Sequence, residues 1–534
     1  MVNDWGTKTR LARVAAWLDS RSAIALLLIL TVGLMARLPL LQSRDAWLDE
    51  LANYEMARGG PLSGLPDRVR SNDRFPPGFH YLSIFASEPK DVRFLSLFAG
   101  LACVPLARIL GAKTFGSATG WMAAIIVAVS PSFVFFSREG RPFALGLFVL
   151  YAFLTCIAEL LRQPRKRVFA CTIAVAIAVC MTQYAVIVVC CVSCALAILL
   201  VTCEVPRKWA VIEMLSAILF VLCVAGAWMY FSYAAPQIST RGTGAGQFRE
   251  MFYDIFDPVT AVPFLADHTL QISQYAALGG VVGPRWAALA AMTIACGLAF
   301  AVRNLRDTSE RWLVSSAAGS IVAFMILAGI DKHPYGGTRH CMILLPLLYT
   351  WFAAGVGRAK GRLAIFSVVA FIGLIGLMTI GLVRVNPAEN RYQVSELIPQ
   401  LTSRASANES LILTGSYDIP TFVHQTTGDP FAGMGAFGES WEGNTIAMSL
   451  PNFKHTVFLI NLREVPPKGG QGRKLVVATA VGNRFWVIDS YRSEPPPEPL
   501  AEGSRFEAME VLRAPGVRAT LWQKLPTDNS KRSD

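Results

Sequence analysis

Long apolar runs alternate with short polar segments over residues 1–384 of the chain. The runs begin near residues 23, 92, 117, 142, 168, 184, 209, 286, 312, 341 and 363. An α-helix needs about 20 apolar residues to cross the roughly 30 Å hydrocarbon core of a bilayer, and on that criterion the pattern predicts about eleven membrane-spanning helices.

The fifth and sixth apolar runs nearly merge into one stretch of more than thirty residues. Polar and bulky residues interrupt it at 181–184, "MTQY". The interruption predicts either a tight turn between two helices or a kink in one long helix. The length of the stretch favours two helices.

The region from residue 385 onward is polar and has a different pattern. It alternates short β-like runs with helix-like pieces such as "VSELIPQL", and the β-like runs are "SLILTG", "TVFLIN", "KLVVATAV", "RFWVIDS" and "RATLWQKL". We therefore predict two domains, a transmembrane domain over 1–384 and a small mixed α/β domain over 385–534, which is an ordinary domain length. The loop 44–91 is predicted to carry short interfacial helices.

Composition supports a membrane protein, because 53% of the 534 residues are hydrophobic and only 16% are charged, against about 25% in soluble domains. The net charge of +12 would suit nucleic acid, but the basic residues cluster in short loops between apolar runs. Such loops stay cytoplasmic. We expect a multi-pass cytoplasmic (inner) membrane protein with a cytoplasmic N-terminus, a periplasmic C-terminal domain and no nucleic-acid partner.

This topology leaves four segments on the outer face, namely 44–91, 137–143, 235–285 and 331–340. The first contains "RDAWLDELANYE", with two adjacent acids, Asp49 and Glu50. One interpretation makes Asp49 the N-cap of a short helix and Glu50 a favourable first-turn charge. The other makes Asp49 a general base, held at a fixed and exposed place.

The same loop continues with "NDRFPPGFHYL", which holds the acceptor or loop candidates Asp73, His80 and Tyr81. Two prolines stiffen this stretch, and its aromatic residues suit a membrane interface. An interfacial element is an adequate explanation. A role near the acceptor is the alternative.

Two outer turns contain arginines. "SREGRPF" has Arg138 and Arg141 on either side of Glu139, and "DKHPYGGTRH" has Lys332 and Arg339. Outward-facing arginine runs against the usual charge bias of membrane proteins, which indicates a local purpose. That purpose is either a salt bridge or lipid-headgroup contact, or a bidentate grip on a phosphate.

The order of these motifs resembles the membrane glycosyltransferases of the GT-C superfamily, most closely the bacterial branch related to protein O-mannosyltransferases and aminoarabinose lipid A transferases. The resemblance covers roughly residues 23–383 in layout, and "NRFWVIDSY" is similar to the outer domain of that branch. The chain departs from it at Arg339-His340, where the family has Arg-Tyr or Arg-Phe, and at 75–77, where it commonly has His-Pro-Pro.

The resemblance implies an enzyme that transfers a sugar from a polyprenyl-phosphate donor to a lipid, glycan or protein acceptor of the envelope. It implies Asp49 as base, Glu50 as its partner, and Arg138, Arg141 and Arg339 near the donor phosphate. Lys332, which lies in the same turn as Arg339, is a further phosphate-binding candidate from the residues alone. One carboxylate opposite the phosphate predicts inversion.

The sequence leaves two other points open. Asp49, Glu50 and His80 could ligate a divalent cation, but they lack a tight ligand spacing, so we expect no metal site. The alternative function is a transporter or flippase of lipid-linked envelope precursors, and a non-catalytic assembly factor is a third. Against transport, the spans hold few mid-helix charges and no repeat.

Overall fold

The computed structural model describes residues 16–39, 41–73, 75–204, 209–235, 251–279, 293–294, 302, 305, 307–359, 362–388 and 393–405, together with 409–414, 446–449, 456–460, 474–476, 483–490, 498–500, 506–514 and 517–525. The chain divides into two compact units. The first comprises Met1–Leu41 and Met56–Pro387, and the second comprises Gln42–Glu55 and Ala388–Asp534. A short piece of the predicted loop 44–91 therefore belongs to the same unit as the C-terminal domain.

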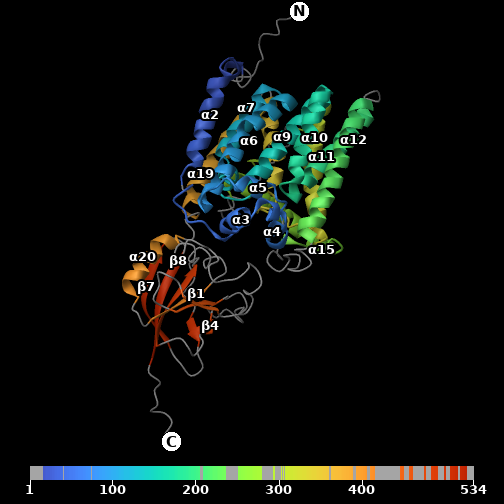
Figure 1. Ribbon diagram of the computed structural model, residues 1–534. Coiled ribbons are helices and arrows are strands. Elements are labelled where there is room, and N and C mark those ends of the chain that lie inside the picture. The colour runs from blue at the N-terminus through green and yellow to red at the C-terminus, as the bar shows by residue number, and fades with distance from the viewer. Residues whose placement is uncertain are drawn as a thin grey trace, which may run out of the picture. The chain divides into compact units, whose positions relative to one another are not determined.

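The first unit is a bundle of helices that run alongside one another (Figure 1). Its longer helices are α2 (Ser22–Arg37), α6 (Val92–Phe115), α7 (Ser117–Val129), α9 (Phe143–Arg162), α10 (Lys166–Cys180), α11 (Tyr184–Glu204), α12 (Trp209–Met229), α15 (Pro258–Leu278), α17 (Thr308–Gly329), α18 (Leu345–Arg358) and α19 (Arg362–Ala388). In chain order, three short helices stand between the longer ones: α4 (Leu65–Asn72), α5 (Gly78–Ser83) and α8 (Pro131–Phe136). Helix α3 (Leu48–Arg58) begins in the segment Gln42–Glu55, which belongs to the second unit.

Among the described residues, six helices are long and apolar enough to cross a membrane. They are Pro89–Phe115, Phe143–Arg162, Tyr184–Cys203, Trp209–Ala234, Thr308–Gly329 and Ala364–Val383. Shorter apolar helices occupy Ser22–Arg37, Ser117–Val129 and Met342–Arg358. Helices thus stand at ten of the eleven expected positions, and the run near residue 286 lies almost wholly outside the described residues.

The break between the fifth and sixth runs is a turn between two helices. Helix α10 ends at Cys180, and α11 begins at Tyr184. The Met181 carbonyl at this turn accepts a hydrogen bond from the Gly78 amide at 2.9 Å. A Cβ on residue 78 would come within 2.4 Å of the same oxygen, so glycine is needed for this close approach.

Helix α15 was not predicted, although it spans 21 residues inside the segment assigned to an outer loop. Its ends carry ordinary signals. The Asp257 side chain caps the Val259 amide, Pro258 occupies the first turn, and Gly279 follows the helix with a φ of +67°. These residues could have identified the helix from sequence.

A buried arginine ties the first helix to the bundle. The Arg37 guanidinium donates to the carbonyl oxygens of Gly33, Ala128 and Val127 at 2.8–3.1 Å, and to Ser137 Oγ at 3.1 Å. Backbone oxygens thereby satisfy a charge that is fully buried. The contacts fix α2 against α7 and the turn that follows α8.

The second unit contains a β-sheet (Figure 1). The sheet has six strands in the order β2-β3-β1-β5-β8-β7. The strands are β1 (Ser410–Thr414), β2 (Ile446–Ser449), β3 (Thr456–Ile460), β5 (Arg484–Ser490), β7 (Phe506–Ala514) and β8 (Val517–Lys524), while β4 (Lys474–Val476) and β6 (Glu498–Leu500) form a separate pair. Strand β1 runs parallel to β3 and β5, and the pairs β2–β3, β5–β8 and β7–β8 are antiparallel.

Helix α20 (Val394–Arg404) packs on this sheet. Its apolar residues Val394, Leu397 and Leu401 recur at helical spacing and are fully buried. They meet a sheet core that includes Trp486 and Leu521. The mixed helix-and-sheet architecture and the helix at "VSELIPQL" agree with the prediction for this region.

Candidate functional site

The turn 137–142 connects α8 to α9 and packs against α6. Ser96 on α6 donates its hydroxyl to the Arg141 carbonyl at 3.2 Å. Gly100 on α6 approaches Ser137 so closely that a Cβ there would lie 1.9 Å from the hydroxyl oxygen. The backbone that carries these arginines is therefore closely packed against α6.

Arg138 contacts the end of α2. Its side chain is 1% exposed, and its guanidinium donates to the carbonyl oxygens of Ala36 and, at 3.2 Å, of Arg37. Carbonyls in the last turn of a helix lack intrahelical partners, and a cation there is favourable. In this structure Arg138 thus caps α2.

Arg141 and Arg339 share one aromatic ring. Arg141 Cζ lies 5.8 Å and Arg339 Cζ 5.9 Å from the ring centroid of Phe143, at the start of α9. Arg141 also lies 5.4 Å from the ring centroid of Phe75. Two guanidinium groups from segments almost two hundred residues apart therefore meet around Phe143.

An acid–histidine pair adjoins Arg141. His80 Nε2 lies 3.3 Å from Asp73 Oδ2, and the Phe75 amide donates to Asp73 Oδ1 at 3.3 Å. Burial raises the pKa of the Asp73 carboxyl, but the His80 hydrogen bond and the charge of Arg141 outweigh it and lower that pKa below its ordinary value. Asp73 is therefore an anion at neutral pH and a poor proton acceptor.

The segment 331–340 lies against α15. A Cβ on residue 337 would come within 2.3 Å of the Gln271 carbonyl oxygen, so only glycine allows this approach. Tyr275 on the same helix interacts electrostatically with both Glu139 and Arg339. Lys332 in this segment is exposed.

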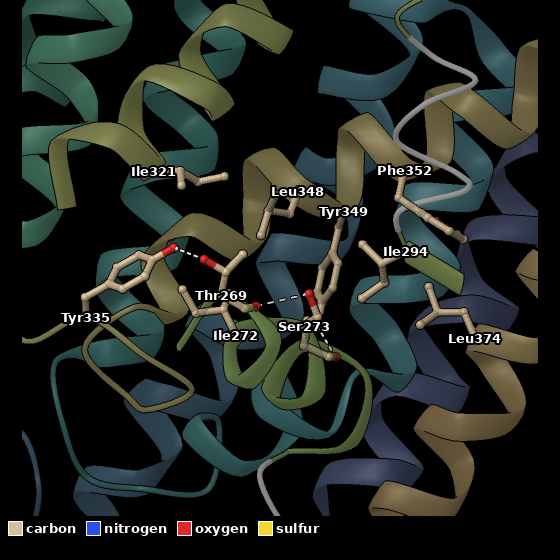
Figure 2. Close-up of a pocket in the computed structure, with 11 residues that line it drawn as sticks. Thr269, Ile272, Ser273, Ile294, Ile321, Tyr335, Leu348, Tyr349, Phe352 and Leu374 are labelled. Atoms are coloured by element: carbon tan, nitrogen blue, oxygen red, sulfur yellow. Dashed lines mark hydrogen bonds between the residues drawn. The ribbon is translucent and has the colours of Figure 1, made fainter. Parts of the chain in front are cut away.

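Helix α15 and the segment 331–340 also line a cavity of about 80 Å³ (Figure 2). Its wall is mostly apolar and includes Ile272, Ile321, Leu348, Phe352 and Leu374. The few polar groups are already paired. Thr269 Oγ1 and Tyr335 OH lie 2.8 Å apart, and Tyr349 OH donates to the Ala276 carbonyl at 2.7 Å. For comparison, an apolar protein cavity of about 150 Å³ binds benzene.

Asp49 and Glu50 lie in the second unit, at the beginning of α3. The helix starts at Leu48, so Asp49 occupies its first turn and not the N-cap position that one interpretation assigned to it. Glu50 is fully buried, its Oε1 lies 3.3 Å from Arg44 Nη2, and its Oε2 accepts from the Trp47 amide at 3.3 Å. Glu50 thus closes half of a capping box.

The structure brings part of the predicted set together within the first unit. Asp73, His80, Arg141 and Arg339 gather around Phe75 and Phe143. Tyr81 packs against the core of the helix bundle and interacts electrostatically with Tyr233. Within the described residues, no group of three or more His, Cys, Asp or Glu side chains could hold a metal ion.

Sequence reasoning missed Phe143 and Tyr275. Phe143 stands directly after the arginine turn, so an aromatic residue next to two cations was a readable signal. Tyr275 had no such signal, because its helix was interpreted as part of a loop.

His333 predicts a pH dependence for the segment that carries Arg339. Burial lowers the pKa of its imidazole to about 4, from an ordinary value of 6.5, although the His340 carbonyl opposes this shift. Between these pH values the unfolded chain binds a proton that the folded chain does not, so the free energy of unfolding falls as pH falls from about 6.5 to about 4. Thermal unfolding midpoints across this range should drop less steeply for His333→Asn than for the native protein. The same pH dependence of the thermal midpoint in both proteins would show that His333 is not the group responsible for it.

Comparison with known proteins gives matches among solved structures only. No family model and no curated protein matches the chain. Similar structures include an oligosaccharyltransferase of Archaeoglobus fulgidus in complex with zinc and sulfate, with a TM-score of 0.46, 13% identity and coverage of 75% of this chain and 61% of that one. AglB of the same organism, in complex with an inhibitory peptide and a dolichol-phosphate, has a TM-score of 0.45 and 12% identity, with coverage of 77% of this chain and 64% of that one.

ArnT of Cupriavidus metallidurans bound to undecaprenyl phosphate gives a TM-score of 0.46 and 12% identity over 95% of this chain and 98% of that one. The chain spans less than two thirds of the length of the archaeal enzymes. ArnT is of one of the two kinds that the motif order resembles, the aminoarabinose lipid A transferases.

Proposed function

We propose that the protein is a membrane glycosyltransferase that moves a sugar from a polyprenyl-phosphate donor to an acceptor at the outer face of the cytoplasmic membrane. The observation that carries the proposal is the placement of Arg141 and Arg339 around Phe143, with Arg339 on a segment that also lines an apolar cavity. A lipid phosphate needs both features, since its head is anionic and its chain is apolar.

In this proposal Arg141 and Arg339 hold the donor phosphate. Guanidinium groups suit this task because their planar fork matches two phosphate oxygens. The first carbons of the prenyl chain lie in the cavity beside Tyr335 and Tyr349. Asp73 is paired with His80 and next to Arg141, so it orients that arginine.

The reaction is a single displacement. An acceptor O–H or N–H attacks the anomeric carbon, its proton passes to a carboxylate base, for which the resemblance implies Asp49, and the bond from that carbon to the phosphate oxygen breaks. The electron pair of that bond leaves with the polyprenyl phosphate, whose charge the arginines stabilise. Attack opposite the leaving group inverts the anomeric configuration.

The test uses the full chain in detergent or nanodiscs with synthetic polyprenyl-phosphate sugars that differ in sugar and in anomeric configuration. We expect acceptor-dependent release of polyprenyl phosphate from one anomer and a product of the opposite configuration. The same preparation in liposomes distinguishes the transporter alternative. Translocation of a labelled lipid-linked sugar without covalent transfer would overturn the proposal.

A further inference from the structure

The beginning of the first outer loop is hydrogen-bonded to the C-terminal domain within the second unit. The Ser395 amide donates to Asp45 Oδ2 at 2.8 Å, across 350 positions of sequence. Gln393 Nε2 donates to the Ser43 carbonyl at 3.4 Å. Asp45 is 1% exposed and Gln393 is 5% exposed, so water competes little for either contact.

The Asp45 contact completes a helix that lacks a side-chain cap of its own. Ser395 lies in the first turn of α20, where amides have no intrahelical acceptor, and the residue at the N-cap position, Gln393, makes no capping hydrogen bond with its side chain. Asp45 supplies the acceptor. As an anion at a helix N-terminus it also interacts favourably with the helix dipole.

From Asp45 the chain runs through a short rigid stretch to Asp49. The buried Arg44–Glu50 ion pair bridges this stretch, and the Trp47 amide donates to the same carboxylate. The Trp47 carbonyl accepts from the amides of Glu50 and Leu51 at 2.9 and 3.0 Å. Because these contacts constrain the backbone between Asp45 and Asp49, a displacement of Asp45 should also shift Asp49.

We propose that Asp45 is a positioning residue, through which α20 of the C-terminal domain sets the place of Asp49. The inference rests on the proposed function for its kinetic consequence. The N-terminus of α20 thereby links the C-terminal domain to the segment that carries Asp49. A misplacement of about 1 Å in a reacting group costs about 10²-fold in rate.

The experiment compares Asp45→Ala with Asp45→Asn, which keeps an acceptor oxygen, and with Ser395→Pro, which removes the donor amide from a helix turn that tolerates proline. The control is Glu396→Gln, which removes one negative charge from the same turn at an exposed side chain. We expect kcat to fall about 10²-fold for Asp45→Ala and Ser395→Pro with an unchanged KM for the lipid donor. Asp45→Asn should recover part of the loss, and Glu396→Gln should match the native protein.

Hydrogen exchange of the amides in 46–51 provides a readout that does not depend on activity. It should accelerate in Asp45→Ala and Ser395→Pro and stay native in the control. Native exchange in both variants, or fast exchange with native kcat, would overturn the inference. A native protein inactive toward every donor would contradict the proposed function alone, because exchange would still report whether Asp45 holds the loop.

Discussion

Turnover with a lipid-linked sugar is expected to fall by about 10²–10⁴-fold when Asp49 is replaced by asparagine, because the acceptor proton then has no base to receive it. Asparagine keeps the size of the side chain. It removes a favourable first-turn charge worth about 0.3–1 kcal/mol, so the thermal midpoint should change little. Initial rates at saturating donor, together with thermal unfolding of the same preparation, measure both quantities.

Glu50→Gln is the matched comparison for Asp49→Asn. Glu50 is buried in an ion pair with Arg44, and breaking a buried pair costs about 3–5 kcal/mol because the partner charge remains. We therefore expect this variant to lower the thermal midpoint more than Asp49→Asn does. An active and stable Asp49→Asn protein would remove Asp49 as the base.

Arg339→Ala is expected to weaken use of the lipid donor strongly, by about 2–5 kcal/mol in kcat/KM, since a desolvated charged contact to the phosphate is lost. Arg339→Lys should restore only part of the activity, because lysine lacks the planar fork. The control is Arg70→Gln, which removes a positive charge from an exposed position paired with Asp67. Near-native kcat/KM in Arg339→Ala would assign this arginine to the membrane interface.

Arg138→Ala tests whether Arg138 holds the donor phosphate or has a structural role at the end of α2. The sequence grouped Arg138 with Arg141 and Arg339, whereas its guanidinium in the structure donates to the end of α2. Its removal leaves buried carbonyls without donors, so the loss should be seen first in the thermal midpoint.

The helical part of the fold was predictable because each span is a local signal. Twenty apolar residues identify a helix without any knowledge of its neighbours. Helix α15 was missed since its apolar residues alternate with Asp267, His268 and Gln271, which lowers hydropathy below that of a span. The helix signals at its two ends were local too and could have been used.

The sheet was predictable only in part. The five β-like runs all became strands, whereas β2, β6 and β7 were missed. In β7 the pairing register shifts between Ala508 and Glu510, which moves later side chains to the opposite face. A single period of two therefore does not run through this strand, and period two is the sequence signal for a half-buried strand.

The candidate site was predictable as a set of residue types and not as an arrangement. Motif order identified Arg141, Arg339 and the acids of the first loop. Whether Asp73 meets Arg141, or Asp45 meets α20, depends on contacts between segments tens to hundreds of residues apart. A local sequence pattern cannot predict contacts between segments so far apart in the chain.

The arginines in and beside the turn 137–142 are buried, and this has a consequence for how the binding of an anionic lipid would depend on ionic strength. Arg37, Arg138 and Arg141 are each less than a tenth exposed and lie in or against the turn that also carries Glu139. Mobile ions screen exposed charges beyond about 8 Å at physiological salt but reach buried charges poorly. If Arg141 holds the donor phosphate as proposed, that attraction should therefore persist in concentrated salt, whereas an attraction to exposed charges would weaken.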